Sequence, residues 1–398
     1  MKKKNKFLGI FCSAVLCAGA MFSCVVNPIK NIFADDQIVV TKVAGQDNVY
    51  TDGTNKYKKA YTGVNEIIYN SVIVNPGLGI SWQALVKSYK YDNGNLIDWG
   101  KEAYYKYEPI EWQIVNINDG KAMLVSDRAL ANMPFQPTYD SDGYTAANGA
   151  PDKTPANTYQ YSNLRYWLNG MEQTNQTGVN NDTNLQQLGL PSTLTYPTSF
   201  MSAFTADEIK NILPISIANQ NNVTSYTQDA NGDKIFLLSI EDLIGDTSLL
   251  DDGYIQNKAY HIKASDYAKS QGAGDQSSAN ESYSAYCWTR TSSSISYGGR
   301  SFGTGESAFY PTVDQFYICV VPAMFVDATT KIFENKAVGD KVEIGMWPQH
   351  VAVNVVESDS GTTPNTGVNL NLMGLYVSLT ACGLVGVAVL GNKKKEQR

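Results

Sequence analysis

Histidine is scarce in this chain, and its scarcity limits the chemistry that the protein can perform. The 398 residues include two histidines, His261 and His350. Neither stands in a cluster of histidine and cysteine with the spacing of a zinc site. The sequence therefore predicts no metal site of this kind, and mechanisms that rely on several imidazoles are close to excluded.

Cysteine is also rare, and most of it lies at the two ends of the chain. The terminal apolar segments hold Cys12, Cys17, Cys24 and Cys382. The remaining pair, Cys287 and Cys319, can form at most one disulfide, and the residues leave open whether it forms. Both cysteines stand in strand-like apolar contexts, where a structural bridge or inert thiols are more common than reactive thiols.

The catalytic motifs with well-defined spacing are missing too. The sequence contains no Gly-x-Ser-x-Gly elbow, no Walker loop and no His-Glu-x-x-His helix, so we predict no catalytic residues. The formal net charge is −7, and both ends of the chain are basic, so the part between them is more acidic still. This charge argues against nucleic acid and other polyanions as partners.

The amino-terminal segment is typical of a secretory signal peptide. Residues 1–6 are basic, an apolar run extends from Phe7 to about Val26, and the small residue Ala34 precedes two aspartates. This order of regions defines a cleavable export signal, so we expect residues 1–34 to be removed after Ala34. An uncleaved anchor and lipoprotein processing at Cys24 are the alternatives, but the residues before Cys24 fit a lipoprotein signal poorly.

The carboxyl-terminal segment, residues 363–398, resembles the sorting signal of Gram-positive surface proteins. It begins with a variant of the LPXTG pentapeptide, in which Thr363 replaces the usual Leu. Pro364, Thr366 and Gly367 are retained. The resemblance implies that a sortase cleaves between Thr366 and Gly367 and joins the protein covalently to peptidoglycan.

A membrane-length segment follows this motif. Residues 372–390 are apolar, and three lysines follow at residues 393–395. About 19 apolar residues nearly span the hydrocarbon core of a bilayer, and the lysines stay on the cytoplasmic side. If no sortase accepts the motif, the same segment serves as a membrane anchor. In both cases we expect the protein at the extracellular surface, anchored to the cell wall in the first case.

Strand signals occur at both ends of the remaining part. Residues 109–117 alternate apolar and polar side chains as a half-buried strand does, and Asp119-Gly120 turns them into a partner strand at residues 122–125. Short apolar runs at residues 234–238, 286–290 and 317–321 are further predicted strands.

Helix signals lie between these strands. Ser162 and Gly170 are expected to cap and stop a helix at residues 163–169. Thr205 and Glu208 form a capping-box sequence that opens a helix reaching Ile212. Ser239 and Ser265 are in position to cap two further short helices.

The spacing of these signals predicts the fold class and the organisation of the chain. Scattered short strands and short helices favour an α+β fold over a doubly wound sheet. Residues 136–160 and 172–195 lack periodicity and are predicted to be long binding or lid loops. The expected parts are listed in order: a signal peptide at 1–34, a β-rich segment at 35–107, a domain at 108–330, a β segment at 331–356, a linker at 357–366 and the sorting signal at 363–398.

The domain at 108–330 contains seven characteristic segments in a fixed order, at 109–112, 164–169, 204–208, 233–239, 266–268, 288–291 and 322–323. Through these collinear segments the domain resembles the bacterial domain-of-unknown-function family DUF6273. The chain departs from the pattern at Val321, where the family tends to have Arg, at Cys319, where Gly is usual, and at Thr289. A stretch at 344–349 is similar to the segment that begins the domain, and it is either a degenerate repeat or an edge strand.

The resemblance implies a fold related to C-type lectins and formylglycine-generating enzymes. Such a fold has a twisted antiparallel sheet with short flanking helices and long loops. We expect Trp112, Trp167, Phe236 and Trp288 to share one core, because each lies on the apolar face of a segment that carries the resemblance.

Three charged residues are candidates for binding. Glu111 beside Trp112 is a carboxylate for an aromatic pocket, and Arg165 and Arg290 are able to clamp a ligand carboxylate in bidentate fashion. The alternatives are a solvated Glu111 and arginines in buried ion pairs with nearby acids. Aspartates at 140–143 and 229–233 have calcium-like spacing but are more typical of turns, so calcium is possible and no cofactor is predicted.

Three functions follow from these observations. The first is a wall-anchored, non-catalytic binding or adhesion module for an extracellular glycan or peptide. The second is an oxidase of the formylglycine-generating type, which needs paired reactive cysteines. The third is a structural wall subunit with internal Lys–Asn cross-links. The predicted surface location and the lack of a catalytic constellation favour the first.

Overall fold

The structure is a computed structural model that describes part of the chain. It describes residues 37–62, 90–98, 101–137, 139–171, 199–217, 227–228, 230–244, 262–273, 285–293, 299–303, 307–309, 311–315 and 318–358. The predicted signal peptide with Ala34, the loop at 172–195 and the sorting signal at 363–398 lie outside the described residues. The chain divides into two units, Val43–Val355 and the paired terminal segments Met1–Lys42 and Val356–Arg398.

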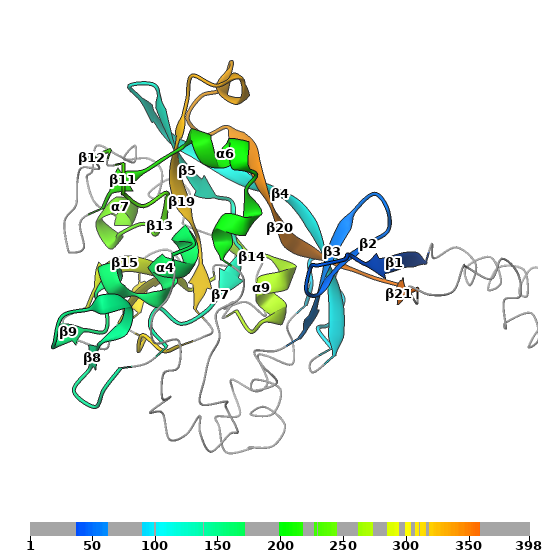
Figure 1. Cartoon of the computed structure of the whole chain (residues 1–398), viewed down its shortest axis with the longest axis horizontal. Coiled ribbons are helices and arrows are strands. Elements are labelled where there is room, and N and C mark those ends of the chain that lie inside the picture. Colours follow the sequence, from blue (N-terminus) through cyan, green and yellow to red (C-terminus); the bar gives the residue numbers. More distant parts are fainter. Residues whose placement is uncertain are drawn as a thin grey trace, which may run out of the picture. The chain divides into compact units, whose positions relative to one another are not determined.

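The larger unit contains an open sheet centred on the long strand β4 (Glu102–Asn118). Its strands follow the order β10 (Ile212–Leu213), β19 (Ala323–Asp327), β5 (Lys121–Ser126), β4, β3 (Lys56–Tyr61) and β2 (Val49–Thr51). In addition, β13 (Ile235–Phe236) pairs with β19, and β20 (Lys341–Ala352) pairs with β4. These pairs are antiparallel, and Figure 1 shows β4 and β20 running side by side.

A second sheet in the same unit is mixed. Its order is β17 (Ser307–Phe309), β16 (Gly299–Gly303), β15 (Cys287–Ser292), β18 (Cys319–Val320) and β7 (Ala131–Asn132). Here β15 and β18 are parallel, which differs from the predicted antiparallel pattern. Short two-stranded pairs join β11 (Ile215–Ser216) to β12 (Thr227–Gln228), β14 (Lys263–Ala264) to β6 (Arg128–Ala129), and β8 (Tyr144–Thr145) to β9 (Thr154–Pro155).

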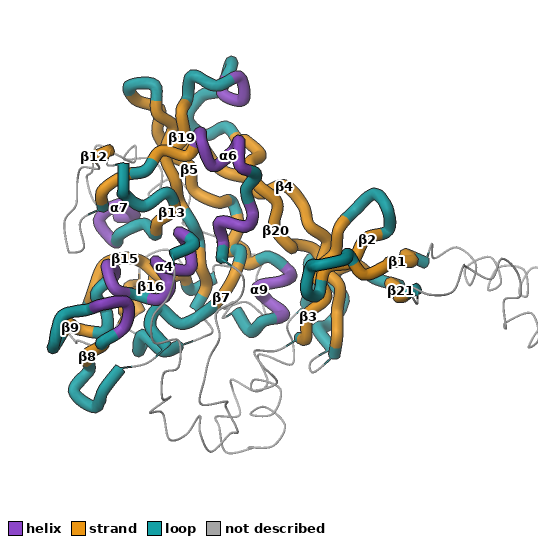
Figure 2. The backbone as a smooth tube through the Cα atoms, viewed as in Figure 1, coloured by secondary structure: helices purple, strands orange, loops and turns teal. Residues whose placement is uncertain are grey.

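The described helices are short and begin where the sequence places capping residues. They are α4 (Asn163–Asn169), α6 (Ala206–Asn211), α7 (Ile240–Ile244) and α9 (Asp266–Ser270), with 3-10 turns η2 (Ala147–Gly149), η3 (Tyr159–Tyr161), η4 (Phe200–Ala203) and η5 (Lys331–Phe333). The Ser162 side chain accepts from the N–H of Arg165, and Thr205 with Glu208 forms the predicted capping box. Figure 2 shows strands and loops dominating the unit, which confirms a sheet-rich α+β fold.

The predicted hairpin between β4 and β5 is present. Asp119 and Gly120 both have positive φ, 49° and 70°, as a tight two-residue turn requires. Along β4 the alternating residues Ile110, Trp112 and Ile114 are fully buried. The period of two in the sequence therefore identified the core face of this strand.

The core is divided in a way that the sequence analysis did not predict. Trp112, Trp167 and Trp288 share one cluster, but Phe236 belongs to a second cluster. The reason is the alternation of side chains along β13, where Ile235 faces the first cluster and Phe236 the opposite one. The prediction of one shared core is therefore correct for the three tryptophans and wrong for Phe236.

The segment at 136–160 is more ordered than the predicted long loop. It contains β8, η2, β9 and η3. The buried Gln136 side chain donates to Thr145, and Asn148 donates to Asn163. The same side chains also bond to the backbone: Thr145 accepts from the N–H of Ala147, and Asn148 donates to the carbonyl of Tyr161. Such bonds leave no hydrophobic period in the sequence.

In the terminal unit, β1 (Ile38–Lys42) lies next to β21 (Val355–Glu357), which begins at the last residue of the larger unit. The backbone N–H of Ser358 donates to the carbonyl of Val40 across 2.9 Å. Within the described residues, no helix has the length and hydropathy needed to cross a bilayer. The predicted membrane segment at 372–390 lies outside those residues.

Candidate functional site

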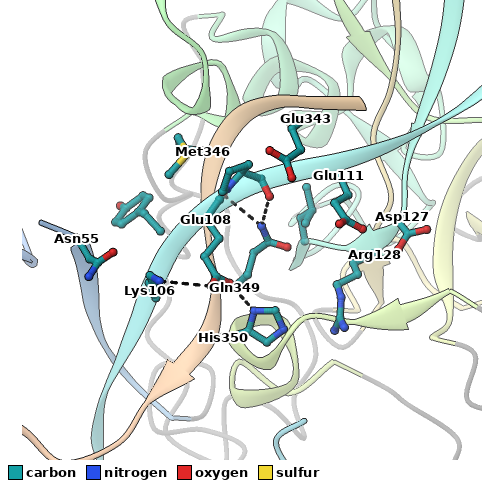
Figure 3. A pocket seen from close by; sticks show the side chains of 13 residues that line it. Asn55, Lys106, Glu108, Glu111, Asp127, Arg128, Glu343, Met346, Gln349 and His350 are labelled. Atoms are coloured by element: carbon teal, nitrogen blue, oxygen red, sulfur yellow. Dashed lines mark hydrogen bonds and ion pairs between the residues drawn. The ribbon is translucent and has the colours of Figure 1, made fainter. Parts of the chain in front are cut away.

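A polar pocket of about 460 Å³ lies against β4, between the ends of two neighbouring strands. On one edge of β4, β3 pairs with residues 102–106 and β5 with residues 112–118. The residues between these pairings line the pocket together with β20 and the start of β6 (Figure 3). The pocket is therefore a consequence of where strand pairing on β4 stops and resumes.

Prolines and bulges open the ladder at this place. Pro109 on β4 and Pro348 on β20 have no N–H to donate, and proline inside a sheet is tolerated at edges and bulges. The register of β20 against β4 shifts twice, between Glu343 and Met346 and again at Gln349. Bulges of this kind re-aim side chains and are common near binding sites.

Gly345 makes the first of these bulges possible. Its φ is 77°, a backbone conformation that L side chains rarely adopt, and an added Cβ would lie 2.8 Å from the ring of Phe204. Its N–H donates to Glu208, the capping-box residue of α6. The stretch at 344–349 thus lies within β20, whose partner among the described strands is β4, and this arrangement favours the edge-strand interpretation over a repeat.

Gln349, the extra residue of the second bulge, is the most informative side chain in the pocket. It is 6% exposed, and its Nε2 donates to the carbonyls of Glu108 and Pro109 at 3.2 and 2.8 Å. Among the described residues its Oε1 accepts no hydrogen bond, and Figure 3 shows that oxygen turned away from the two bonded carbonyls. The fold therefore holds a fixed acceptor at the pocket wall.

Carboxylates provide further acceptors around it. Lys341 bridges Glu111 and Asp127 at 2.9 and 2.8 Å. Partial burial alone would lower the pKa of Lys341, but the two carboxylates outweigh it and raise the pKa. Glu343 lies directly opposite Glu111 in the strand register, so two like charges face each other across β4 and β20.

His350 joins the pocket to a second charge cluster. Its Nδ1 contacts Glu108, and its Nε2 lies 3.5 Å from Asp92. The hydrogen bond with Asp92, opposed by burial and supported by Glu108, raises the pKa of His350 to about 9. The imidazole is therefore a cation at neutral pH.

Asp92 is the centre of that cluster. Arg128 and Lys269 contact its carboxylate at 2.6 and 2.5 Å. Burial would raise the pKa of Asp92, but His350, Lys269 and Arg128 together hold it far below its usual range. Asp92 is therefore a carboxylate at neutral pH.

The structure separates the three predicted binding residues. Glu111 lies in the polar pocket. Arg165 instead grips Asp233, with Nε and Nη2 donating at 2.7–3.0 Å, and Arg290 is buried with its Nη1 at 2.5 Å from Asp242. For the two arginines the structure shows the alternative interpretation, ion pairs with nearby acids.

The two cysteines of the folded part are neighbours. Cys287 and Cys319 are register partners in the parallel strands β15 and β18, and both are buried. They carry thiols in this structure rather than a disulfide. Strands β15 and β18 are therefore adjacent, as a bridge between the two residues would require.

The calcium-like sequences form other contacts. Asp140 accepts from the N–H groups of Asp142 and Tyr144, which is a turn arrangement, and Asp233 is occupied by Arg165. Asp229 lies outside the described residues. Among the residues that the structure describes, no group of three or more acidic, histidine or cysteine side chains is placed to hold a metal.

Sequence analysis found Glu111 but missed Gln349, His350 and Asp92. A glutamine in a strand gives no chemical signal, and His350 was considered only as a possible zinc ligand, for which its sequence neighbours lack the spacing. Proline in both 109–112 and 344–349 was the available signal, since paired prolines interrupt a ladder.

Residues 119–311 match the model of a family described as "Domain of unknown function (DUF6273)". The matched part is slightly less than half of the chain, and it supports the predicted domain family over these residues. No curated protein and no solved structure matches the chain. Both β4 and β20 lie outside the matched residues, whereas Arg165 and Arg290 with their acids lie inside.

Proposed function

We propose that the chain is an exported, cell-wall-anchored surface protein whose folded part binds an extracellular glycan or peptide in the polar pocket. The observation that carries this proposal is the Gln349 amide, which is buried and fixed by two backbone carbonyls with its oxygen left for a ligand. A preorganised acceptor of this kind adds affinity, because the Gln349 side chain is already ordered and loses little conformational entropy when the ligand binds.

The ligand chemistry follows from the groups in the pocket. Gln349 and Glu343 present acceptor oxygens, so the part of the ligand that contacts them must supply hydrogen-bond donors. Sugar hydroxyls and peptide N–H groups are such donors. Lys106, Arg128 and His350 also line the pocket and can donate to acceptors elsewhere on the ligand. A volume of about 460 Å³ falls in the range of small-molecule sites, so the pocket accommodates a few sugar or amino-acid units rather than a folded partner.

The binding experiment uses the full-length chain in a mild detergent on glycan and peptide arrays. Gln349→Met should weaken capture about tenfold, since it removes one well-placed hydrogen-bond acceptor. Glu343→Gln should weaken it less, and Glu334→Gln, an exposed acid outside the pocket, should leave it unchanged. Equal capture by the wild type and by Gln349→Met would contradict the pocket as the binding site.

The surface address is tested separately. Muramidase should release the protein from cells with its new carboxyl terminus at Thr366, because the sorting motif implies a covalent bond to peptidoglycan. Complete extraction by detergent alone would show that residues 372–390 act as a membrane anchor and that no sortase joins the chain to the wall.

An oxidase of the formylglycine-generating type is the second candidate, and one observation favours it. Cys287 and Cys319 are register partners, as a reactive pair would need to be. Their exposures of 2% and 0% leave little access for a substrate thiol, which favours the binding function. Conversion of a cysteine peptide to an aldehyde by the purified chain would establish the oxidase. The proposed kinship with the C-type-lectin fold is compatible with both functions.

A further inference from the structure

A second hollow, the ring-lined cavity, opens next to the polar pocket and has a different character. It has a volume of about 740 Å³, and its walls include Tyr107, Tyr267, Trp347 and Pro348. Tyr267 and Trp347 are each more than nine-tenths buried, so they are fixed parts of the fold rather than mobile surface rings. Flat apolar walls of this kind favour a ligand with a ring.

One cation is built into this cavity. Lys58 on β3 lines it, and its Nζ lies 6.0 Å from the centroid of the Tyr267 ring. Among the described residues no carboxylate lies within ion-pair distance of Lys58, although burial lowers the pKa of its ammonium group. The Tyr267 ring compensates only part of the cost of removing a cation from water.

The adjacent residue of the strand shows the contrast. Lys59 faces the other side of β3, where Glu102 contacts its ammonium at 2.7 Å. Both lysines lie near tyrosine rings, but only Lys59 has an acid beside it among the described residues. Among the described residues, the same strand therefore contains one lysine with an acid partner, Lys59, and one without, Lys58.

The charge of the cavity wall also favours an anionic ligand. Its ionisable residues other than tyrosine are Lys56, Lys58 and Asp47, so the wall is positive overall although the chain carries a formal net charge of −7. A positive site on an acidic protein selects anions locally. A ligand carboxylate would supply the counter-ion that Lys58 lacks within the described part of the chain.

We propose that the ring-lined cavity binds a small carboxylate that carries a six-membered ring, with Lys58 as its counter-ion. The ring packs between Tyr107, Tyr267 and Trp347 while the carboxylate accepts from the Lys58 ammonium. This site goes beyond the proposed function, because its charge is opposite to that of the polar pocket and its ligand is an acceptor rather than a donor.

The experiment compares matched ring compounds by calorimetry on the full-length chain in a mild detergent. Benzoate and glucuronate are the anionic probes, and benzyl alcohol and glucose are their neutral counterparts. At least one carboxylate should bind about tenfold more tightly than its neutral counterpart, as a charge-assisted hydrogen bond provides. Which of the two binds shows whether the ring is aromatic or a sugar.

Variants then assign the effect to Lys58. Lys58→Met should abolish the preference for the carboxylate, and Lys58→Arg should keep most of it. Lys59→Met is the matched control and should bind like the wild type. Melting temperatures of all three variants check that the fold is intact.

Three results would overturn the inference. They are binding of neutral and anionic probes with equal affinity, an undiminished preference in Lys58→Met, and no binding of either carboxylate to the wild type. None of them depends on Gln349. Failure of the ring-lined cavity and failure of the polar pocket are therefore distinguishable.

Discussion

Two regions of this protein differ in how far the hydrogen-bonding capacity of their charged and polar side chains is used within the fold. Within the residues that match the family, Arg165 and Arg290 each have an acid at hydrogen-bond distance. Along β4 and its neighbours the pattern differs. Within the part of the chain that the structure describes, Gln349 keeps one acceptor unused and Lys58 has no carboxylate at ion-pair distance. All four side chains are capable of binding a ligand. The difference shows that the residue type matters less than whether the fold has already used its bonding capacity.

The strongest test of this contrast is to break the buried pair. Arg290→Met leaves Asp242 buried without its cation and should cost about 3–5 kcal/mol of unfolding free energy, measured in urea. Lys341→Met removes a half-exposed cation that contacts two carboxylates of the polar pocket, and it should cost about 0–1 kcal/mol.

The double variant Asp242→Asn with Arg290→Met is the control, and it should recover part of the loss because no charge is left unpaired. If Arg290→Met changes the unfolding free energy by less than about 1 kcal/mol, the ion pair does not stabilise the fold. Arg290 would then again be a candidate ligand-binding residue.

A smaller effect is expected for the second arginine. Arg165→Met removes a partly exposed arginine from the buried Asp233 carboxylate. The loss should cost about 1.5–3 kcal/mol, the range of hydrogen bonds to charged groups. Urea unfolding of this variant measures the cost, and Arg165→Lys should restore only part of it because lysine cannot bind in bidentate fashion. Full stability of Arg165→Met would contradict a structural role.

The smallest effect concerns pH. The pKa of His350 is raised from 6.5 to about 9, so its stabilising contribution is fully present below pH 6.5 and is lost as the pH rises through 9. Because the ring is partly exposed, solvent screening keeps this contribution below about 1 kcal/mol.

The measurement compares the unfolding free energy of the wild type and of His350→Gln across this pH range. The wild type should lose stability relative to the variant as the pH rises. Parallel curves would show that Asp92 and Glu108 do not hold the imidazolium.

Local signals in the sequence were sufficient for much of the fold. The caps at Ser162 and Thr205 and the turn at Asp119-Gly120 depend on residues within one turn of each other, and all three are present. The pairing of β20 with β4 and the ion pair between Arg165 and Asp233 both join residues that are far apart in the sequence. No local pattern specifies either contact. Phe236 was assigned to the wrong core for a related reason, since alternation gives two faces but does not say which core each face meets.

The candidate site was less predictable than the fold. Glu111 was identified because it stands beside Trp112 in the sequence. The other residues that line the pocket around it were not identified. Gln349 becomes informative only after the bulges in β20 have placed its amide against β4. Lys58 and Lys59 are adjacent lysines that the sequence alone does not distinguish. Their contacts distinguish them, because Lys59 lies beside Glu102 and Lys58 lies over the Tyr267 ring on the other side of β3.

The pairing of β4 with β20 also determines when the protein can finish folding. The indole of Trp112 donates to the carbonyl of Ile344, a residue 232 positions later in the chain. Contacts of such high sequence separation form slowly, because a long loop must close before they contribute. A chain that emerges from its amino terminus would therefore hold β4 with an open edge until β20 arrives, and open edges attract other strands. Until β20 pairs with β4, the open edge of β4 can pair with strands of other chains and aggregate. The polar pocket, which needs both strands, does not exist before that pairing.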